Sequence, residues 1–222
     1  MTLSKRLTAI AELVPDGYDE IWDCCCDHGL LGIYLLKTAH VNNVHFVDVV
    51  PELMVKLENK LRGIALNKGQ ATWQVHCKDV SQLSVDHSKR NLMIIAGVGG
   101  DLLISLLTAL LQANNTSKQG DIEFIICPVH HCYQVRHECQ RLGLGLVAEK
   151  IVCDNNRFYE VLHLATHSKQ PISATGQQMW CLDNIEHITY LNRLVAHYTR
   201  MQQQSQQGYF QQALNAYNKL LN

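Results

Sequence analysis

The sequence has no apolar stretch long enough to cross a bilayer, and its charges almost cancel. Its longest apolar run, Leu102–Leu111, has about half the length of a membrane-spanning helix. Residues 1–15 alternate charged and apolar side chains, which is not the pattern of a secretory leader. The formal net charge of -1 gives no general attraction to nucleic acid, so RNA binding would require a local basic face. We therefore expect a cytoplasmic protein with no membrane partner.

Two patterns common around metals and phosphates are missing as well. The nine cysteines include no Cys-x-x-Cys pair, and the adjacent Cys24–Cys26 cannot all face one ion. We predict no metal site, although histidines and cysteines crowd residues 130–139, and we expect free thiols in a reducing compartment. The first expected turn is neither Gly-x-Gly-x-x-Gly nor a Walker loop, which disfavours a dinucleotide or a triphosphate as ligand.

Strands and helices alternate along residues 1–167. Strands are expected at Glu20–Cys25, Val44–Asp48, Thr72–Cys77, Leu92–Ala96, Glu123–Cys127, Leu146–Cys153 and Phe158–Leu164. Helices are expected at Leu3–Val14, Gly29–Ala39, Pro51–Ile64, Leu102–Gln112 and His131–Leu142. This alternation predicts an α/β fold with a mostly parallel sheet between helical layers. The last two strands are joined by the short turn Asp154–Arg157, which predicts an antiparallel hairpin.

The remaining residues, 168–222, have a different pattern. Ser168–Gly176 is a polar linker. Two apolar stripes with steps of three and four follow: Ile188, Leu191, Val195 and Tyr198, then Phe210, Leu214, Tyr217 and Leu221. They predict an antiparallel, coiled-coil-like helical hairpin whose turn is the glutamine-rich segment 202–207. We therefore divide the chain into a domain of residues 1–167 and a helical hairpin of residues 168–222.

The strongest functional signal lies in Glu20–Gly29, E-I-W-D-C-C-C-D-H-G, and in the strand that follows it. A buried strand, a tight turn and a helix precede a second strand that ends at Asp48. In nucleoside-binding α/β domains the first turn contacts the ligand with its backbone, and the second strand-end acid accepts bonds from ribose hydroxyls. S-adenosylmethionine fits a turn without a dense glycine nest, because it has a ribose and an adenine but no phosphates. The alternative is that Asp23 and Asp48 only cap the following helices.

Two further positions fit the same ligand. Asp79 follows the third strand, where contacts with adenine are expected, although it could be an ordinary turn residue. Ala96-Gly97-Val98-Gly99-Gly100 follows the fourth strand, and its three glycines would let the backbone approach a ligand closely. A simple strand-to-helix turn would need only one or two glycines.

Together, four short patterns resemble the bacterial tRNA (adenine(22)-N(1))-methyltransferase family. They are Leu3-Ser-Lys-Arg-Leu7, Asp23-x-x-x-Asp27-His28, Ile95-Ala-Gly-x-Gly-Gly100 and Tyr159-Glu160-Val161. The resemblance covers most of the chain, including the C-terminal hairpin. It implies an enzyme with a class I methyltransferase fold, a Rossmann-like three-layer sandwich whose last strand is antiparallel. It also implies S-adenosyl-L-methionine as methyl donor and tRNA as acceptor, and no obligate protein partner is evident.

The resemblance also implies which residues form the site. The expected cofactor-binding residues are Asp23, Cys25, Asp27, Gly29, Asp48, Asp79, Ala96, Gly97, Gly99 and Gly100. Methylation at N1 of adenine leaves positive charge on the ring, which a carboxylate near the exocyclic amine would stabilise. Asp27 is the predicted catalytic carboxylate, and His28 is expected to orient the turn or the base.

Two departures from the family pattern keep other functions open. Cys25 stands where the family has a glycine, and Cys127-Pro128-Val129 stands where the family tends to have Gln-Pro-Asn. The alternatives are a class I methyltransferase with a different substrate, or a binding protein that keeps the fold but has lost catalysis.

RNA contacts are expected from basic residues on two helical elements. Lys5 and Arg6 lie on the N-terminal helix, and Arg193 and Arg200 share a face of the predicted hairpin. The alternative is a solvated helix face. The aromatic residues near the motifs that could stack a flipped base are Trp22, Tyr133 and Tyr159.

Overall fold

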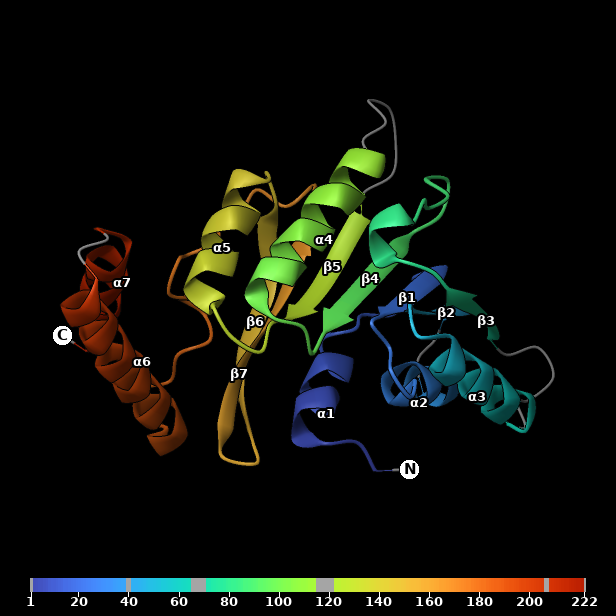
Figure 1. Cartoon of the computed structure of the whole chain (residues 1–222), viewed down its shortest axis with the longest axis horizontal. Helices are drawn as coiled ribbons and strands as arrows, with labels where there is room; N and C mark the ends of the chain where they lie inside the picture. Colours follow the sequence, from blue (N-terminus) through green and yellow to red (C-terminus); the bar gives the residue numbers. More distant parts are fainter. Residues whose placement is uncertain (1, 39–40, 65–70, 115–121, 206–207, 222) are drawn as a thin grey trace.

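The computed structural model describes residues 2–38, 41–64, 71–114, 122–205 and 208–221, and these residues form a seven-stranded sheet (Figure 1). The strand order is β3-β2-β1-β4-β5-β7-β6. The strands are β1 (Glu20–Cys24), β2 (Asn43–Asp48), β3 (Thr72–Cys77), β4 (Asn91–Ala96), β5 (Ile122–Cys127), β6 (Gly145–Asp154) and β7 (Arg157–Ala165). Strands β1 to β5 are parallel, and β7 runs antiparallel to both β5 and β6. The predicted mostly parallel sheet with an antiparallel last strand is confirmed.

The central strands are buried along nearly their whole length because both faces of the sheet are covered. All residues of β1 are buried, and so are the first five residues of β4. Such continuous burial is typical of parallel strands between two helical layers. The tight turn between β6 and β7 depends on two residues: Asn155 and Asn156 both have left-handed backbones, with φ of 52° and 61°. Asparagine tolerates this conformation, and two such residues make the tight turn that suits a twisted hairpin.

Helices pack against both faces of the sheet (Figure 1). On one face lie α1 (Lys5–Ala11), α2 (Leu30–Thr38) and α3 (Pro51–Arg62), and on the other lie α4 (Gly100–Ala113), α5 (Cys132–Arg141) and the 3-10 helix η1 (Val80–Gln82). Each face has its own apolar core.

The N-terminal helix is shorter than predicted at both ends. It begins after Ser4, whose hydroxyl accepts a bond from the backbone N–H of Leu7 at 3.3 Å, and its last residue is Ala11. Pro15 disfavours a helical backbone at the residue before it, which accounts for the early end. The predicted end of the second helix, Ala39, lies outside the described residues.

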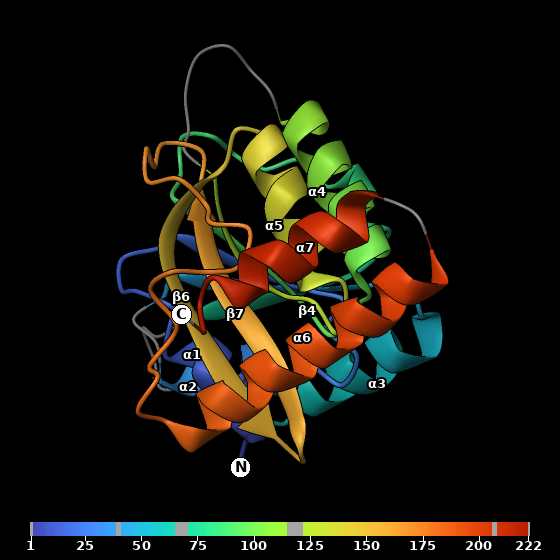
Figure 2. The ribbon, with the colours of Figure 1, turned by 90° about the vertical axis from the view of Figure 1, so that its left-hand side faces the viewer.

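The C-terminal segment forms the predicted helical hairpin of α6 (Ile185–Gln204) and α7 (Gly208–Asn218), which lies against α5 (Figure 2). An aromatic cluster joins the three helices, because Tyr133 of α5 contacts the rings of Tyr198, Tyr209 and Tyr217. Residues 206 and 207 of the predicted glutamine-rich turn lie outside the described residues. None of the helices in the described part of the chain has the length and apolar character needed to cross a membrane.

A buried ion network fastens the hairpin to the sheet. The fully buried Arg136 donates to the carboxylates of Glu149 and Glu160, each at 2.6 Å. The hydroxyl of Tyr190 in α6 donates to Glu160 at 2.8 Å, and Arg136 also donates to the backbone carbonyl of Ser173 at 3.2 Å. Burial alone would lower the pKa of Arg136, but the two carboxylates raise it above its usual value, so the guanidinium stays charged. The predicted polar linker is therefore held against the domain at this point.

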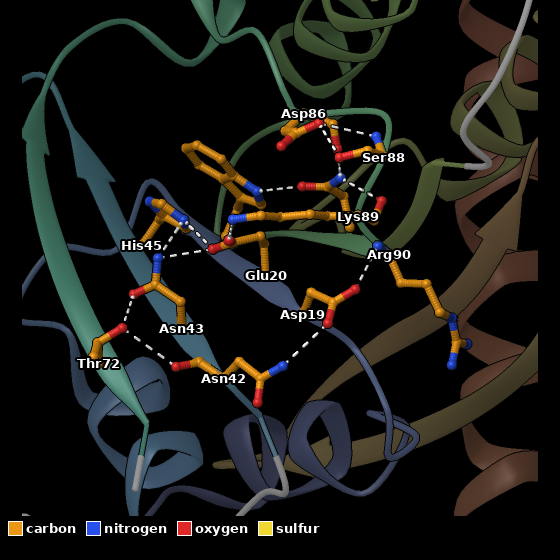
Figure 3. Close-up of polar contacts among 12 residues, drawn as sticks. Asp19, Glu20, Asn42, Asn43, His45, Thr72, Asp86, Ser88, Lys89 and Arg90 are labelled. Atoms are coloured by element: carbon orange, nitrogen blue, oxygen red, sulfur yellow. Dashed lines mark hydrogen bonds and ion pairs between the residues drawn. The ribbon is translucent and has the colours of Figure 1, made fainter. Parts of the chain in front are cut away.

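A second polar network occupies the amino ends of β1 and β2 (Figure 3). The buried carboxylate of Glu20 accepts a bond from Asn43 at 2.7 Å, lies 2.6 Å from Nε2 of His45, and pairs with Lys89. The ring of His45 stacks on Trp22, with centroids 3.7 Å apart. Burial opposes the ionisation of Glu20, but its three partners lower its pKa below the usual value. These polar groups are paired with one another at the amino edge of the sheet, whereas Asp23 and Asp48 lie toward the opposite, carboxyl edge.

Candidate functional site

The candidate site is a pocket of about 250 Å³ at the carboxyl edge of the sheet, beside the ends of β1 and β4. The strand order reverses between these two strands, so their following loops diverge and leave a crevice. Seven predicted site residues line the pocket: Arg6, Asp23, Cys25, Asp27, His28, Ala96 and Gly97. The pocket thus brings together the first turn, the loop after β4 and the N-terminal helix.

The turn after β1 has an unusual backbone. Cys25 and Asp27 are left-handed, with φ of 57° and 51°, and Gly29 follows with φ of 65°. A side chain in this region costs about 1–2 kcal/mol, and glycine adopts it freely. Cys25 therefore follows the backbone path that a glycine would take, so the turn keeps its shape at the price of local strain.

Asp48 is fixed against this turn. One of its carboxylate oxygens accepts a bond from the backbone N–H of Asp27 at 3.0 Å, and the other accepts one from Val50 at 3.2 Å. Each carboxylate oxygen has a second lone pair, so Asp48 can still accept two hydroxyl hydrogen bonds. Burial, followed by the nearby charges of Asp48, Asp23 and Asp79, raises the pKa of Cys25 to about 11. The strand-end acids therefore surround one neutral thiol.

Asp23 has a structural bond as well as a place in the pocket wall. It is buried, and its Oδ2 accepts a bond from the backbone N–H of Gly32 at 2.8 Å, which ties β1 to the first turn of α2. Burial raises the pKa of Asp23 to about 7, with Asp48 adding to the effect and the bond from Gly32 opposing it.

Asp27 and His28 lie at the mouth of the pocket. The carboxylate of Asp27 is 3.6 Å from Nε2 of His28, and the two side chains are 67% and 65% exposed. Both side chains can therefore reach a substrate that enters from solvent.

The glycines of the loop after β4 have different surroundings. Gly97 has φ of 81°, and a Cβ atom there would meet the guanidinium of Arg6 at 3.7 Å, on the pocket side. A Cβ atom on Gly99 would meet the ring of His130 at 2.7 Å, and one on Gly100 would meet His131 at 2.8 Å. Gly97 thus keeps space open beside the pocket, whereas Gly99 and Gly100 allow close packing against the loop after β5.

Five of the predicted cofactor residues do not line the pocket: Gly29, Asp48, Asp79, Gly99 and Gly100. A Cβ atom on Gly29 would meet the side chain of Leu57 at 2.6 Å, so this glycine allows α2 and α3 to pack closely. Asp79 caps η1, where its carboxylate accepts a bond from the backbone N–H of Ser81 at 2.8 Å, and this bond lowers the pKa of Asp79.

Residues 3–162 match the family described as a methyltransferase domain. The chain belongs to this family. It is 24% identical over 162 residues to the tRNA (adenine(22)-N(1))-methyltransferase of Bacillus subtilis (strain 168), a match that covers 73% of this chain and 64% of that protein. The matched part is less than two thirds of the length of that curated relative. The resemblance inferred from the motifs is confirmed.

Solved structures with a similar fold include complexes with a cofactor or its product. The TrmK protein of M. capricolum, in complex with S-adenosyl-homocysteine, has a TM-score of 0.76 at 17% identity over 99% of this chain and 98% of its own. Sp1610 of Streptococcus pneumoniae, in complex with S-adenosyl-L-methionine, has a TM-score of 0.73 at 18% identity over 100% of both chains. These likenesses confirm the predicted fold, including the C-terminal hairpin.

The four basic residues predicted to contact RNA differ in where they lie and in what they contact. Arg6 lies at the pocket and over the ring of Tyr159, 5.1 Å from its centroid, whereas Lys5 lines a separate cavity beside β6. Arg193 lies 5.1 Å from the ring centroid of Phe158 and donates to the backbone carbonyl of Asn156 at 3.0 Å. Arg200 is exposed.

The pairing of Arg6 with Tyr159 was missed at the level of sequence. Both residues belong to patterns shared with the methyltransferase family, and this shared membership was the signal that could have linked them. Of the three aromatic residues considered for base stacking, only Tyr159 lies near the pocket, beside Arg6. Trp22 is buried and stacks on His45, and Tyr133 is buried under the hairpin.

At the second departure from the family pattern, neither Cys127 nor Val129 lines the pocket. Cys127 is completely buried in the core, and burial raises its pKa to about 12. Its backbone carbonyl accepts a bond from Gly97 at 3.1 Å, which holds the loops after β4 and β5 together. All nine cysteines are free thiols, and across the described ranges no three His, Cys, Asp or Glu side chains form a metal-binding group.

Proposed function

We propose that this chain transfers a methyl group from S-adenosyl-L-methionine to N1 of an adenine in tRNA, in the cytoplasm. The observation that carries the proposal is the pocket at the β1/β4 crevice, which Asp27 and Gly97 line, with Asp48 bonded to the backbone N–H of Asp27. The relative from Bacillus subtilis is named for this reaction, and the similar M. capricolum structure is a complex with the cofactor product.

The residues around the pocket fit this cofactor. Asp48 has lone pairs free for the two ribose hydroxyls, and Gly97 leaves room for a ligand to approach the backbone. The thiol of Cys25 is neutral, so it adds no charge beside the three acids. When bound, S-adenosyl-L-methionine supplies an electrophilic methyl group on a positively charged sulfur.

The exposed residues at the mouth would receive the adenine. Its N1 offers a lone pair only when it is unpaired, so the base must leave its stack and enter the pocket. Arg6 and Tyr159 present a cation and an aromatic ring beside the entrance, which suits a nucleotide with its phosphate. The leaving group is neutral, so positioning provides most of the acceleration.

Asp27 provides the negative charge that the reaction needs beside the adenine ring. As N1 gains the methyl group, positive charge develops on the ring, and a carboxylate at the exocyclic amine stabilises it or accepts a proton. Asp27 is exposed and is held by the bond from its backbone N–H to Asp48. His28, 3.6 Å away, can orient the carboxylate or the base.

The left-handed backbone at Cys25 supports an enzyme over a degenerate binding protein, because the turn keeps the path that a glycine would give.

The test combines calorimetric titration with S-adenosyl-L-methionine and a methylation assay on unmodified tRNA, with the modified position mapped. Asp48→Ala is expected to abolish cofactor binding. Asp27→Ala is expected to keep cofactor binding and folding but to lower kcat by at least about 100-fold. Glu52→Ala, which removes an exposed carboxylate on α3, is the matched control and should behave as wild type. Wild-type protein that binds the cofactor but methylates no tRNA would refute the proposed substrate.

A further inference from the structure

A second cavity, of about 550 Å³, lies between α5 and the C-terminal hairpin. Its walls carry an unusual number of rings: His131, His137, His197, Tyr198, Tyr209 and Phe210. We call it the ring-lined groove. The side chains of Gln134 and Gln212 also line it and add amide donors and acceptors.

The groove is suited to a flat, uncharged ligand with polar edges. Tyr209 and Phe210 are half-buried, and His197 is exposed. Partial desolvation of the ring, with smaller effects of Arg200 and His131, lowers the pKa of His197 below its usual value, which favours the neutral imidazole. Neutral aromatic rings stack on nucleobases, and amide groups bond to base edges.

The charges near the groove favour an anionic ligand such as a nucleic-acid chain. Arg200 lies close enough to His197 to affect its titration, and it is one of the basic residues expected to contact phosphate. The carboxylate that lines the groove, Glu138, is paired with Arg141 at 2.7 Å. A nucleotide could therefore place its base in the groove and its phosphate toward Arg200.

The groove is linked to the proposed methyl-transfer site through the loop after β4. His131 packs against Gly100, and its ring lies 3.5 Å from the carboxylate of Asp101 in the first turn of α4. Burial raises the pKa of Tyr209, on the opposite wall of the groove, and the negative charge of Asp101 adds to this rise. The loop after β4 therefore connects both places, because Gly97 at its start lines the cofactor pocket.

We propose that the ring-lined groove binds a second unstacked base of the RNA, that of a nucleotide flanking the methylated adenine. This inference rests on the proposed function. It assigns the hairpin a role in holding the RNA open, because a base held in the groove cannot restack on the target adenine. Recognition by stacking would tolerate different bases at that position.

The experiment pairs variants of the groove with RNA substrates that lack one base. Each nucleotide within three positions of the methylated adenine is replaced in turn by an abasic residue, and kcat and KM are measured. His197→Ala and the double variant His197→Ala/Phe210→Ala are each compared with wild type. His197 is exposed and touches the aromatic cluster under the hairpin only through the edge of Tyr198, so the single variant disturbs that cluster less than the double variant does.

We expect the double variant to raise KM for intact tRNA by about fivefold or more, with kcat and cofactor affinity unchanged. One abasic position should raise the KM of wild type by a similar factor, and combining it with the variant should add little further loss. Gln211 and Gln212 are neighbours on α7, but of these two only Gln212 lines the groove. Gln212→Ala should therefore raise KM, and the matched control Gln211→Ala should not.

Three results would overturn the inference. Wild-type KM for tRNA in the double variant would show that the rings do not touch RNA. Fully additive losses for variant and abasic substrate at every position would show that the groove holds none of the flanking bases. A wild-type chain that methylates no RNA would remove the proposed function and this inference with it, whereas the first two results leave the proposed function intact.

Discussion

Cys25 occupies the position of the first turn where the family has a glycine. Its backbone is nevertheless left-handed, as a glycine's could be without strain. Replacing it by glycine should relieve the strain of about 1–2 kcal/mol, against a smaller loss from the freer unfolded chain. We therefore predict that Cys25→Gly is at least as stable as wild type and binds S-adenosyl-L-methionine with equal or higher affinity. Urea unfolding and calorimetric titration measure the two effects.

The neighbouring Cys24 provides the control. It is a buried strand residue, and Cys24→Gly should lose roughly 2 kcal/mol of unfolding free energy through lost burial and a freer backbone. Similar losses in both variants would contradict the idea that Cys25 is strained.

The buried carboxyl of Asp23 predicts a pH effect on stability. Its pKa is raised to about 7 in the folded protein, against an unfolded value of 3.8, so the folded state holds a proton that the unfolded state releases. The free energy of unfolding should therefore fall as pH rises from about 4 to about 7, by roughly 1.4 kcal/mol for each unit of difference. Asp23→Asn does not titrate there, and its amide oxygen can still accept the bond from Gly32.

Urea unfolding of both proteins at pH 5 and pH 8, without cofactor, isolates this residue, because all other groups are shared. The stability of Asp23→Asn relative to wild type should be higher at pH 8 than at pH 5. Parallel pH profiles for the two proteins would mean that Asp23 titrates normally.

At the scale of residues, the sequence predicted the acids better than the basic and aromatic partners. Asp23 and Asp48 could be placed because a strand that ends in an acid puts the carboxylate at the ligand edge of a parallel sheet. The stacking of Arg6 on Tyr159 could not be foreseen, because it joins two segments at opposite ends of the domain. The strained backbone of Cys25 was equally hidden, since side-chain identity alone does not show that a cysteine adopts a left-handed backbone.

At the scale of elements, strand and helix periodicity located almost every segment, and the errors lie at the ends. The N-terminal helix was predicted from Leu3 to Val14 but spans Lys5–Ala11, because apolar spacing continues past the hydrogen-bonded turns. In α6, residue spacing likewise did not predict what the two arginines contact. Arg193 and Arg200 share a face by spacing, yet their contacts differ.

This difference leads to a prediction for α6. Arg193 is held by the β6–β7 turn, so Arg193→Ala should mainly lower stability, by up to about 1 kcal/mol. Arg200 is exposed near the ring-lined groove, so Arg200→Ala should weaken tRNA binding and reduce the slope of log affinity against log salt by about one. Filter binding at several salt concentrations measures both slopes, and equal slopes for Arg200→Ala and wild type would exclude a phosphate contact.

At the scale of the whole molecule, the alternation of strands and helices predicted the layered sheet, and two apolar stripes predicted the hairpin after it. Neither pattern predicted how the hairpin is attached. That attachment depends on one fully buried arginine between two carboxylates that are far from it in sequence. The segment 168–176 looked like a free polar linker, but Ile172 is buried in the core and Ser173 is bonded to Arg136.

The proposed division into residues 1–167 and 168–222 can therefore be tested by two fragments with different ends. Fragment 1–181 keeps the carbonyl of Ser173 and the backbone N–H groups of Gln177 and Gln178, which donate to Glu149 at 2.8 Å. Fragment 1–167 lacks all of them, and both fragments lack the hairpin. Bonds to a buried charge stabilise by about 1.5–3 kcal/mol each, so the shorter fragment should unfold roughly 10 °C lower.

Thermal unfolding by circular dichroism, with cofactor titration of each fragment, makes the comparison. We expect both fragments to bind S-adenosyl-L-methionine, because the pocket is built from residues 6–97. Neither should methylate tRNA efficiently if the hairpin holds the RNA. Equal melting temperatures would place the boundary at residue 167 and make 168–181 a passive connection. A lower melting temperature for fragment 1–167 would instead extend the domain to the segment that satisfies the buried charges, because those charges can leave water only when this segment is present.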